Sequence, residues 1–264
     1  MTRASLMRAL FVPLLALSST ACLRGHVNSG PVVPDRPGYT DTPTVLSRGS
    51  VQVEVGYTDD RSSGASYRTF GESLLRVGLV GPVELRLFGN SLAERTAAGA
   101  SRERGIEDAK LGVKVRLIEK PDSVHGITPN LALLVASTVP LGARGFGAGV
   151  AQPEAKLAAS WTTPSPFSIY TNAGVGSVYD GATWKTHGWG SVALWYAVNP
   201  RVSLFTEGLS SHPTSDLFAP SAYVDGGITV LITEQFQADF RIGRGVASNV
   251  RGERFFGFGI ARRW

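Results

Sequence analysis

The feature that most constrains the fold is a period of two that recurs along the chain after about residue 50. In residues 107–117, EDAKLGVKVRL, charged side chains occupy one set of alternate positions and aliphatic side chains fill the other. Successive side chains of an extended backbone point to opposite faces, so this pattern predicts a β-strand. A soluble sandwich would bury the aliphatic face, whereas an outer-membrane barrel would turn it to lipid.

Twelve segments of strand length follow one another, at residues 51–57, 67–79, 83–90, 107–117, 130–139, 154–161, 167–177, 186–197, 202–209, 223–232, 236–243 and 255–264. None has a helical period, and no break in composition divides them. Residues 186–197 alternate poorly, so the faces of this segment stay unassigned. The uncharged stretch 126–143 is long enough for a membrane helix, but Pro129 and Pro140 interrupt it and favour a strand between turns.

The connections between these segments sort by length. Short ones at residues 80–82, 163–166, 198–200 and 233–235 alternate with longer ones at 58–66, 91–105, 141–150, 179–185, 212–220 and 246–253, and only 118–127 is longer than its class requires. Long external loops, short periplasmic turns and an even strand number are typical of outer-membrane barrels. The sequence therefore predicts an all-β fold, a transmembrane barrel of about twelve antiparallel strands in the bacterial outer membrane.

Aromatic residues support a membrane rather than a soluble core. They lie at predicted strand ends, beside the short turns in the case of Trp161, Phe167, Phe236 and Trp264, and beside a long loop in the case of Tyr57 and Tyr67. Two such girdles mark the interfaces of a membrane barrel, although aromatic residues can also pack the rims of a soluble core. The last strand presents Phe256, Phe258, Ile260 and Trp264 on one face, which predicts a signal for the barrel-insertion machinery.

The N-terminal residues predict export. Arg3 and Arg8 mark a basic region, a short apolar core follows at residues 9–17, and small residues precede Cys22, so residues 1–21 are expected to be a signal peptide. Cys22, the only cysteine, stands where a lipoprotein would be cleaved and acylated; ordinary cleavage after Ala21 is the alternative. Residues 22–48 are rich in proline without periodicity and predict an extended spacer before a barrel domain at 49–264.

The charged face must line the lumen, because turning residues 107–117 over would place three cations in lipid at about 2–4 kcal/mol each. The predicted lumen-lining residues are Glu84, Arg86, Asp108, Lys110, Lys114, Arg116, Glu154, Lys156, Tyr170, Asn172, Glu207, Asp225, Asp239 and Arg241. Around a water-filled pore these mixed charges would select solutes. Paired across the lumen they would instead plug it and give a closed structural barrel, and twelve strands allow either outcome.

Other functions have little support in the sequence. The mature chain keeps a net charge of only about +3 without a basic stripe, so nucleic acid is not an expected partner. An outer-membrane lipid hydrolase could use a Ser two residues after a His, and none of His26, His125, His187 and His212 has one. No His or Cys pair has metal-ligand spacing, and the glycine-rich residues 142–149 precede no helix. We expect no enzyme activity, no metal and no cofactor.

Several separated blocks resemble one family. LLRVGLVGPVELRL, GIEDAKLGVKVRL, ASTVPLG, NAGVG, VDGGITVLITEQFQADFRIGRGV and FFGFGIARRW are similar, over about residues 35–264, to the outer-membrane transporter-like proteins named for the meta-pathway of phenol degradation. Trp264, where Phe is commoner, and Cys22 depart from the family pattern. The resemblance implies passage of aromatic or other apolar compounds but supplies no binding residues.

The sequence thus favours a passive channel or transporter for small, aromatic or apolar solutes, gated by the long loops. Its expected partners are outer-membrane lipid, the solutes and the barrel-insertion machinery. A closed structural barrel and an outer-membrane lipid hydrolase are the alternatives.

Overall fold

The structure is a computed structural model, and it describes residues 30–120, 126–163, 166–213 and 220–264. These residues form β1 (Val51–Ser62), β2 (Ala65–Gly78), β3 (Val83–Phe88), β4 (Leu92–Ala97), β5 (Glu103–Ile106), β6 (Ala109–Ile118), β7 (Asn130–Val139), β8 (Pro153–Thr162), β9 (Phe167–Tyr179), β10 (Trp184–Asn199), β11 (Val202–Pro213), β12 (Ser221–Thr233), β13 (Phe236–Gly245) and β14 (Arg254–Arg263). Among the described residues, no helix is long or apolar enough to cross a membrane.

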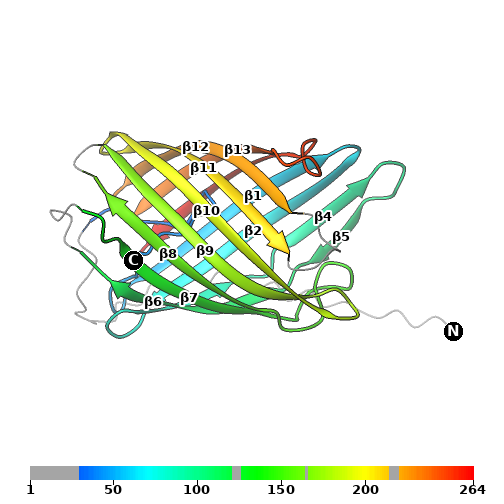
Figure 1. Cartoon of the computed structure of the whole chain (residues 1–264), viewed down its shortest axis with the longest axis horizontal. Coiled ribbons are helices and arrows are strands. Elements are labelled where there is room, and N and C mark those ends of the chain that lie inside the picture. The colour runs from blue at the N-terminus through cyan, green and yellow to red at the C-terminus, as the bar shows by residue number, and fades with distance from the viewer. Residues whose placement is uncertain (1–29, 121–125, 164–165, 214–219) are drawn as a thin grey trace.

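The strands close into one antiparallel barrel (Figure 1). β1 pairs with β14 on one side and with β2 on the other, so the sheet has no free edge there. β2 pairs with β3 along residues 74–78 and with β4 along residues 65–70, and β3 and β4 pair in turn with β6 and β5. β3 with β4, and β5 with β6, are therefore the two halves of interrupted strands. The barrel has twelve strands, which confirms the predicted fold class.

The two faces of the wall are inverted relative to a soluble protein. Leu111 and Val113 point outward and are 47% and 36% exposed, whereas Lys114, the residue after Val113, points inward and is fully buried. In β10, whose faces the sequence left unassigned, Ser191 and Ala193 are buried on the inner face and Val192 is exposed outside. Apolar side chains outside and polar ones inside are the arrangement of a barrel in lipid.

Several predicted loops are strands. Residues 58–66 belong to β1 and β2 apart from a tight turn at Ser63 and Gly64, where Gly64 has a φ of +76°. Residues 91–105 hold β4 and β5, which project past the neighbouring wall in Figure 1. These predictions were wrong because the hairpins lie beyond the apolar band, where both faces meet water and the alternation between polar and apolar residues disappears. Of the predicted long connections, residues 140–152 and 246–253 are long in the structure.

Residues 30–50, which we call the inserted segment, have no helix or strand and lie inside the barrel. The Val32 N–H donates to the Glu234 carbonyl in the β12–β13 turn, and the Gly49 N–H donates to the carbonyl of Gly78 at the end of β2. Both ends of the segment are thus held where the barrel has its short turns. The sequence predicts an extended spacer here but gives no indication that it enters the lumen. The predicted signal peptide and Cys22 lie outside the described residues.

We expect Leu111→Arg to destabilise the barrel in lipid by about 2–4 kcal/mol, because Leu111 lies on the outward face well inside its strand. Thr96→Arg is the matched control, since Thr96 lies in the β4–β5 hairpin beyond the apolar band, where an arginine costs about 0–1 kcal/mol. Equilibrium unfolding in phospholipid vesicles measures both, and equal losses would contradict the proposed membrane position.

Candidate functional site: a lumen closed by an inserted segment

The composition of the inserted segment explains why it stays a loop. Pro31, Pro34, Pro37 and Pro43 each lack an N–H and hold φ near −65°, so this stretch cannot complete a strand ladder. It runs into the barrel, turns near Tyr39 and Thr40, and returns to β1. Several of its backbone donors are bonded by the wall: the N–H of Leu46 donates to Glu84 at 2.9 Å, and that of Tyr39 to Glu207 at 2.7 Å.

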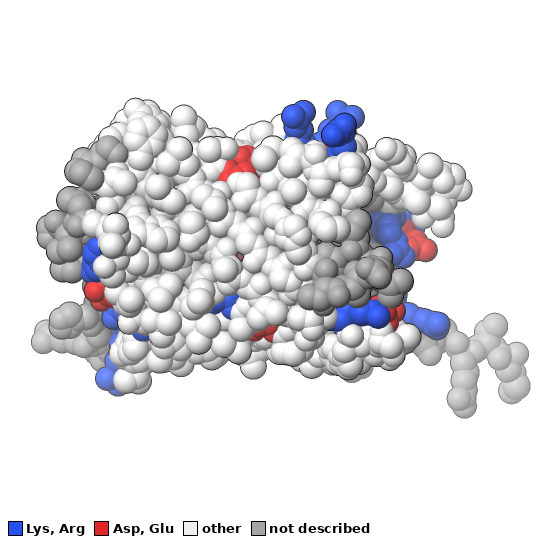
Figure 2. All heavy atoms as spheres, viewed as in Figure 1, with Lys and Arg blue, Asp and Glu red and all other residues white. Residues whose placement is uncertain are grey.

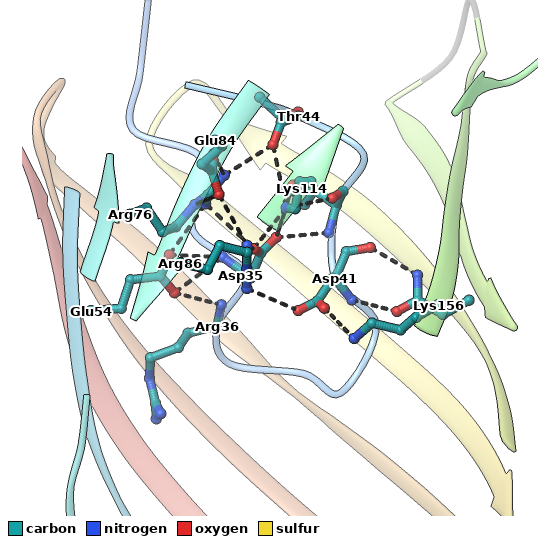
Figure 3. A network of polar contacts seen from close by, with 12 residues as sticks. Asp35, Arg36, Asp41, Thr44, Glu54, Arg76, Glu84, Arg86, Lys114 and Lys156 are labelled. Atoms are coloured by element: carbon teal, nitrogen blue, oxygen red, sulfur yellow. Dashed lines mark hydrogen bonds and ion pairs between the residues drawn. The ribbon is translucent and has the colours of Figure 1, made fainter. Parts of the chain in front are cut away.

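Asp35 is the centre of the polar network (Figure 3). Its carboxylate accepts from Arg86 Nη1 at 2.5 Å and from Lys114 Nζ at 2.8 Å, and Arg76 Nη1 lies 3.6 Å away. These three cations come from β3, β6 and β2, and each has at most 2% of its side chain exposed. One carboxylate of the segment therefore joins three strands of the wall.

Two carboxylates of the wall complete the charge balance around Asp35. Glu84 accepts from Arg76 Nε at 2.8 Å, and Glu54 accepts from Arg76 Nη1 at 3.2 Å. With Asp35 they supply three negative charges against the three cations. A buried ion pair is tolerated best when its remaining donors are bonded as well. The Thr42 and Thr44 carbonyls also accept from Lys114, whereas Arg86 Nε has no hydrogen-bond partner among the described residues.

The far side of the inserted segment is held by a second set of contacts. Asp41 pairs with Lys156 of β8, and its N–H donates to Asn172 of β9 at 2.8 Å. The Thr40 hydroxyl contacts Ser191 of β10 at 2.8 Å and also Glu207 of β11. The segment is therefore attached to both halves of the wall.

Arg36 joins the segment to the strands on either side of the β1–β14 closure. Its Nη1 lies 2.9 Å from Glu72 of β2, and its Nη2 lies 3.6 Å from Asp239 of β13. The space is tight, because a Cβ atom on Gly56 or Gly259 would lie within 2.5 Å of the Arg36 guanidinium. Glycine at these two positions makes room for Arg36.

The charge state of Asp35 follows from its surroundings. Burial by itself would raise the pKa of the Asp35 carboxyl, but Arg76, Lys114 and Arg86 hold that pKa well below its ordinary value. Partial desolvation in the lumen also raises the pKa of Tyr39, although the residue is 44% exposed. The inserted segment therefore enters the lumen with a fixed negative charge at Asp35 and a neutral ring at its tip.

The lumen is closed at the level of the segment. Inward side chains all around the ring are buried there, including Gln52, Arg76, Arg86, Lys114, Ala132, Ala158, Asn172, Ser191, Glu207, Thr229, Asp239 and Ala261. Each strand of the ring thus has an inward residue that packs against the inserted segment or against another inward residue.

Between the segment and the outer end lies a small outer vestibule. It has a volume of about 260 Å³, and its lining includes Asp60, Tyr67, Arg95, Tyr223, Glu253 and Phe255. Tyr39 meets the edge of Phe255 at 6.0 Å between ring centroids, and the Arg241 guanidinium lies 4.6 Å from the Tyr39 ring. The tip of the inserted segment therefore packs against an aromatic ring of the vestibule.

Thirteen of the fourteen predicted lumen-lining residues lie on the inner face of a strand, and Asp108 precedes β6 and contacts the β7–β8 connection. Those that contact the inserted segment are Glu84, Arg86, Lys114, Lys156, Asn172, Glu207, Asp239 and Arg241. Most of them pair with the segment rather than across an open lumen, an arrangement that the sequence did not indicate.

The other six predicted residues have separate partners. Lys110 donates to Glu154 at 2.9 Å, Asp108 accepts from the Gly142 and Ala148 N–H groups, and Arg116 pairs with Glu119. Tyr170 lies beside Trp195, and Asp225 lies opposite Glu207 in the β11–β12 pair. The recorded partners of these six residues therefore lie in the wall or its connections rather than in the inserted segment.

The residues that sequence reasoning missed are those of the segment itself, Asp35, Arg36 and Asp41, and their partners Glu54 and Arg76. The available signal was weak. It consisted of isolated charges in a proline-rich stretch and of two inward charges with no predicted partner.

The predicted insertion signal lies on the outer face. Phe256, Phe258, Ile260 and Trp264 point away from the lumen, and Phe258 is 53% exposed. Tyr57 lies among Phe70, Phe256 and Phe258, with ring centroids 5.1–6.1 Å apart. These rings form an outward aromatic cluster, and recognition of the last strand by the insertion machinery stays a prediction.

One Ser–His contact bears on the hydrolase alternative. Ser210 and His212 lie two residues apart on β11, in the reverse order to the pattern sought in the sequence, and Ser210 Oγ is 2.6 Å from His212 Nε2. Within the described part of the chain, no third side chain orients this imidazole as a catalytic base requires. Nor does any group of three or more His, Cys, Asp or Glu among those residues suit a metal ion.

A closed barrel with an apolar outer wall and a polar lumen defines a porin-like protein of the bacterial outer membrane. The chain belongs to the family described as "Putative MetA-pathway of phenol degradation", whose model matches residues 34–264. The family match thus covers most of the inserted segment as well as the barrel.

Solved structures share the fold at low sequence identity. An outer-membrane channel from Pseudomonas putida F1 is 12% identical, with a TM-score of 0.65 over 90% of this chain and 98% of that one. The NanC porin is 9% identical, with a TM-score of 0.54 over 80% and 98%. The translocator domain of the autotransporter NalP from Neisseria meningitidis is 8% identical, with a TM-score of 0.52 over 81% and 87%. No curated protein matches the chain.

We expect Asp35→Asn to loosen the inserted segment by about 3–5 kcal/mol, because it leaves three buried cations without their shared carboxylate. Hydrogen exchange of residues 32–46 in the detergent-solubilised protein measures the change. Asp180→Asn is the control, since Asp180 bonds only to residues of its own outer turn and to Lys185. Unchanged protection in Asp35→Asn would show that Asp35 does not hold the segment.

The same carboxylate predicts a pH dependence. A displaced segment would carry Asp35 near its ordinary pKa of 3.8, whereas in the lumen that pKa is well below this value. The stabilisation is therefore complete above about pH 4–5 and is lost as the pH falls further. We expect equal protection of residues 32–46 between pH 5 and 7 and a decline below pH 3.8 that Asp35→Asn does not show.

Proposed function

We propose that this protein is a passive outer-membrane channel for small solutes and that the inserted segment is its gate. The observation that carries the proposal is that the lumen is closed by a loop held only through side-chain contacts and hydrogen bonds, with both ends at the same rim. Such a loop can leave the lumen while the strand ladders stay intact. The gate would then be at the periplasmic side, rather than in the long outer loops that the sequence suggests.

The preferred solute is a small aromatic compound. Two observations support this choice: Tyr67, Tyr223 and Phe255 line the outer vestibule, and the family description refers to phenol degradation. Aromatic rings pack edge to face at centroid distances of 4.5–7 Å, the arrangement that Tyr39 already adopts on Phe255. A solute ring could take the place of Tyr39 when the segment withdraws.

A closed structural barrel is the second candidate. It is favoured by the complete burial of Arg76 and Lys114, because displacing the segment would take Asp35 away from both cations. The two candidate functions differ in whether the inserted segment ever leaves the lumen.

Planar-bilayer conductance of three forms tests the gate. We expect low, intermittent conductance from the wild type and a large, steady conductance after deletion of residues 31–46. The locked form carries Thr40→Cys and Ser191→Cys in a Cys22→Ser background, since the Thr40 and Ser191 hydroxyl oxygens lie 2.8 Å apart. It should be silent when oxidised and conduct after reduction.

Two controls make the result decisive. Heat-dependent migration in detergent gels shows that each form is a folded barrel, and the Cys22→Ser parent should conduct as the wild type does. A folded deletion form that is as silent as the locked form would exclude the channel and favour the structural barrel. Faster liposome entry of benzoate than of cyclohexanecarboxylate, lost in Phe255→Leu, tests the aromatic preference separately.

A further inference from the structure

Three arginines form a row on the outer wall at the end of the barrel opposite Val32 and Trp264. Arg244 of β13 lies directly opposite Arg254 of β14, and Arg254 lies directly opposite Arg61 of β1. All three are exposed on the outward face. Like charges placed opposite one another destabilise a strand pair unless a counter-charge lies between them.

The local carboxylates do not balance this row. Asp59 bonds to Arg61 and Arg68, and Glu94 bonds to Arg68 and Arg104. Within the described residues, neither Arg244 nor Arg254 makes an ion pair. Two neighbouring guanidinium groups thus remain available to an anion from outside the chain.

The row lies at the outer edge of the apolar band. Arg254 is ten residues from Trp264 on the same outward face, which is about 33 Å along the strand and about 25 Å along the barrel axis at a tilt near 40°. That height equals the apolar band of an outer-membrane barrel. Figure 2 shows basic side chains projecting from an otherwise nearly uncharged wall toward the end where the β1–β2 and β13–β14 hairpins lie in Figure 1.

Apolar side chains lie directly below the arginines. Ile242 is opposite Phe256 in the β13–β14 pair, one outward position nearer the membrane centre than the row. Both line a surface groove together with Arg61, Arg244 and Arg254. The groove therefore offers cations above and an apolar floor below, as an anionic amphiphile requires.

We propose that this groove binds a phosphorylated glycolipid of the outer leaflet, with a phosphate at the arginine row and acyl chains along Ile242 and Phe256. Guanidinium groups match phosphate with paired, charge-assisted hydrogen bonds. A phosphate between Arg244 and Arg254 would relieve their mutual repulsion. The site is on the outer wall and is independent of the gate in the lumen.

The test uses the full mature chain in neutral detergent and measures its affinity for diphosphorylated lipid A. The double variant Arg244→Gln/Arg254→Gln should bind at least about tenfold more weakly, because it loses charge-assisted hydrogen bonds to phosphate. Arg262→Gln is the matched control. Arg262 is also exposed and outward on β14 but lies over Trp264 at the periplasmic end, and its loss should leave the affinity unchanged.

A ligand series makes the outcome independent of folding in the variants. For the wild type, lipid A without phosphates should bind at least about tenfold more weakly than the diphosphorylated form. Equal binding of the two lipids, an equal loss in Arg262→Gln, or full competition by phosphatidylglycerol at the same concentration would each overturn the proposal.

Discussion

The structure depends on the high free-energy cost of placing a charged side chain in the hydrocarbon of the membrane. An arginine or lysine near the midplane of a barrel's outer face costs about 2–4 kcal/mol, so the charged side chains within the apolar band are confined to the lumen. Lys114 and Arg76 show the consequence, since both point inward and are fully buried. Confinement then creates a second requirement, because a narrow lumen does not supply enough water to solvate every charge that it receives.

The inserted segment meets that second requirement. Asp35 supplies the carboxylate that three wall cations share, Arg36 faces Glu72 and Asp239, and Asp41 faces Lys156. The same pairs that neutralise the lumen also block it, so charge compensation and closure are one arrangement here. In the proposed channel, opening is therefore coupled to exposure of the wall charges, which would then meet water and solute in place of the segment.

The outer wall carries charged side chains at the outer edge of the apolar band. Where the apolar band ends, charge becomes tolerable again, and the wall changes within one outward position from Ile242 and Phe256 to Arg244 and Arg254. This abrupt change places cations at the height of lipid headgroups. The protein thus presents a neutralised interior and a locally cationic rim, two charge patterns with separate physical causes.

The sequence by itself determined the barrel, because a period of two fixes the faces of a strand wherever polar and apolar residues alternate, and thirteen of its fourteen lumen candidates lie on the inner face of a strand. It failed at residues 91–105, where strands beyond the membrane lose that alternation. It also gave no indication that residues 30–50, which have no periodicity, enter the lumen. Only the tertiary structure decided which residues meet inside the lumen. Asp35 is 79 positions from Lys114, and no local pattern records a contact that exists only after the barrel closes around the segment.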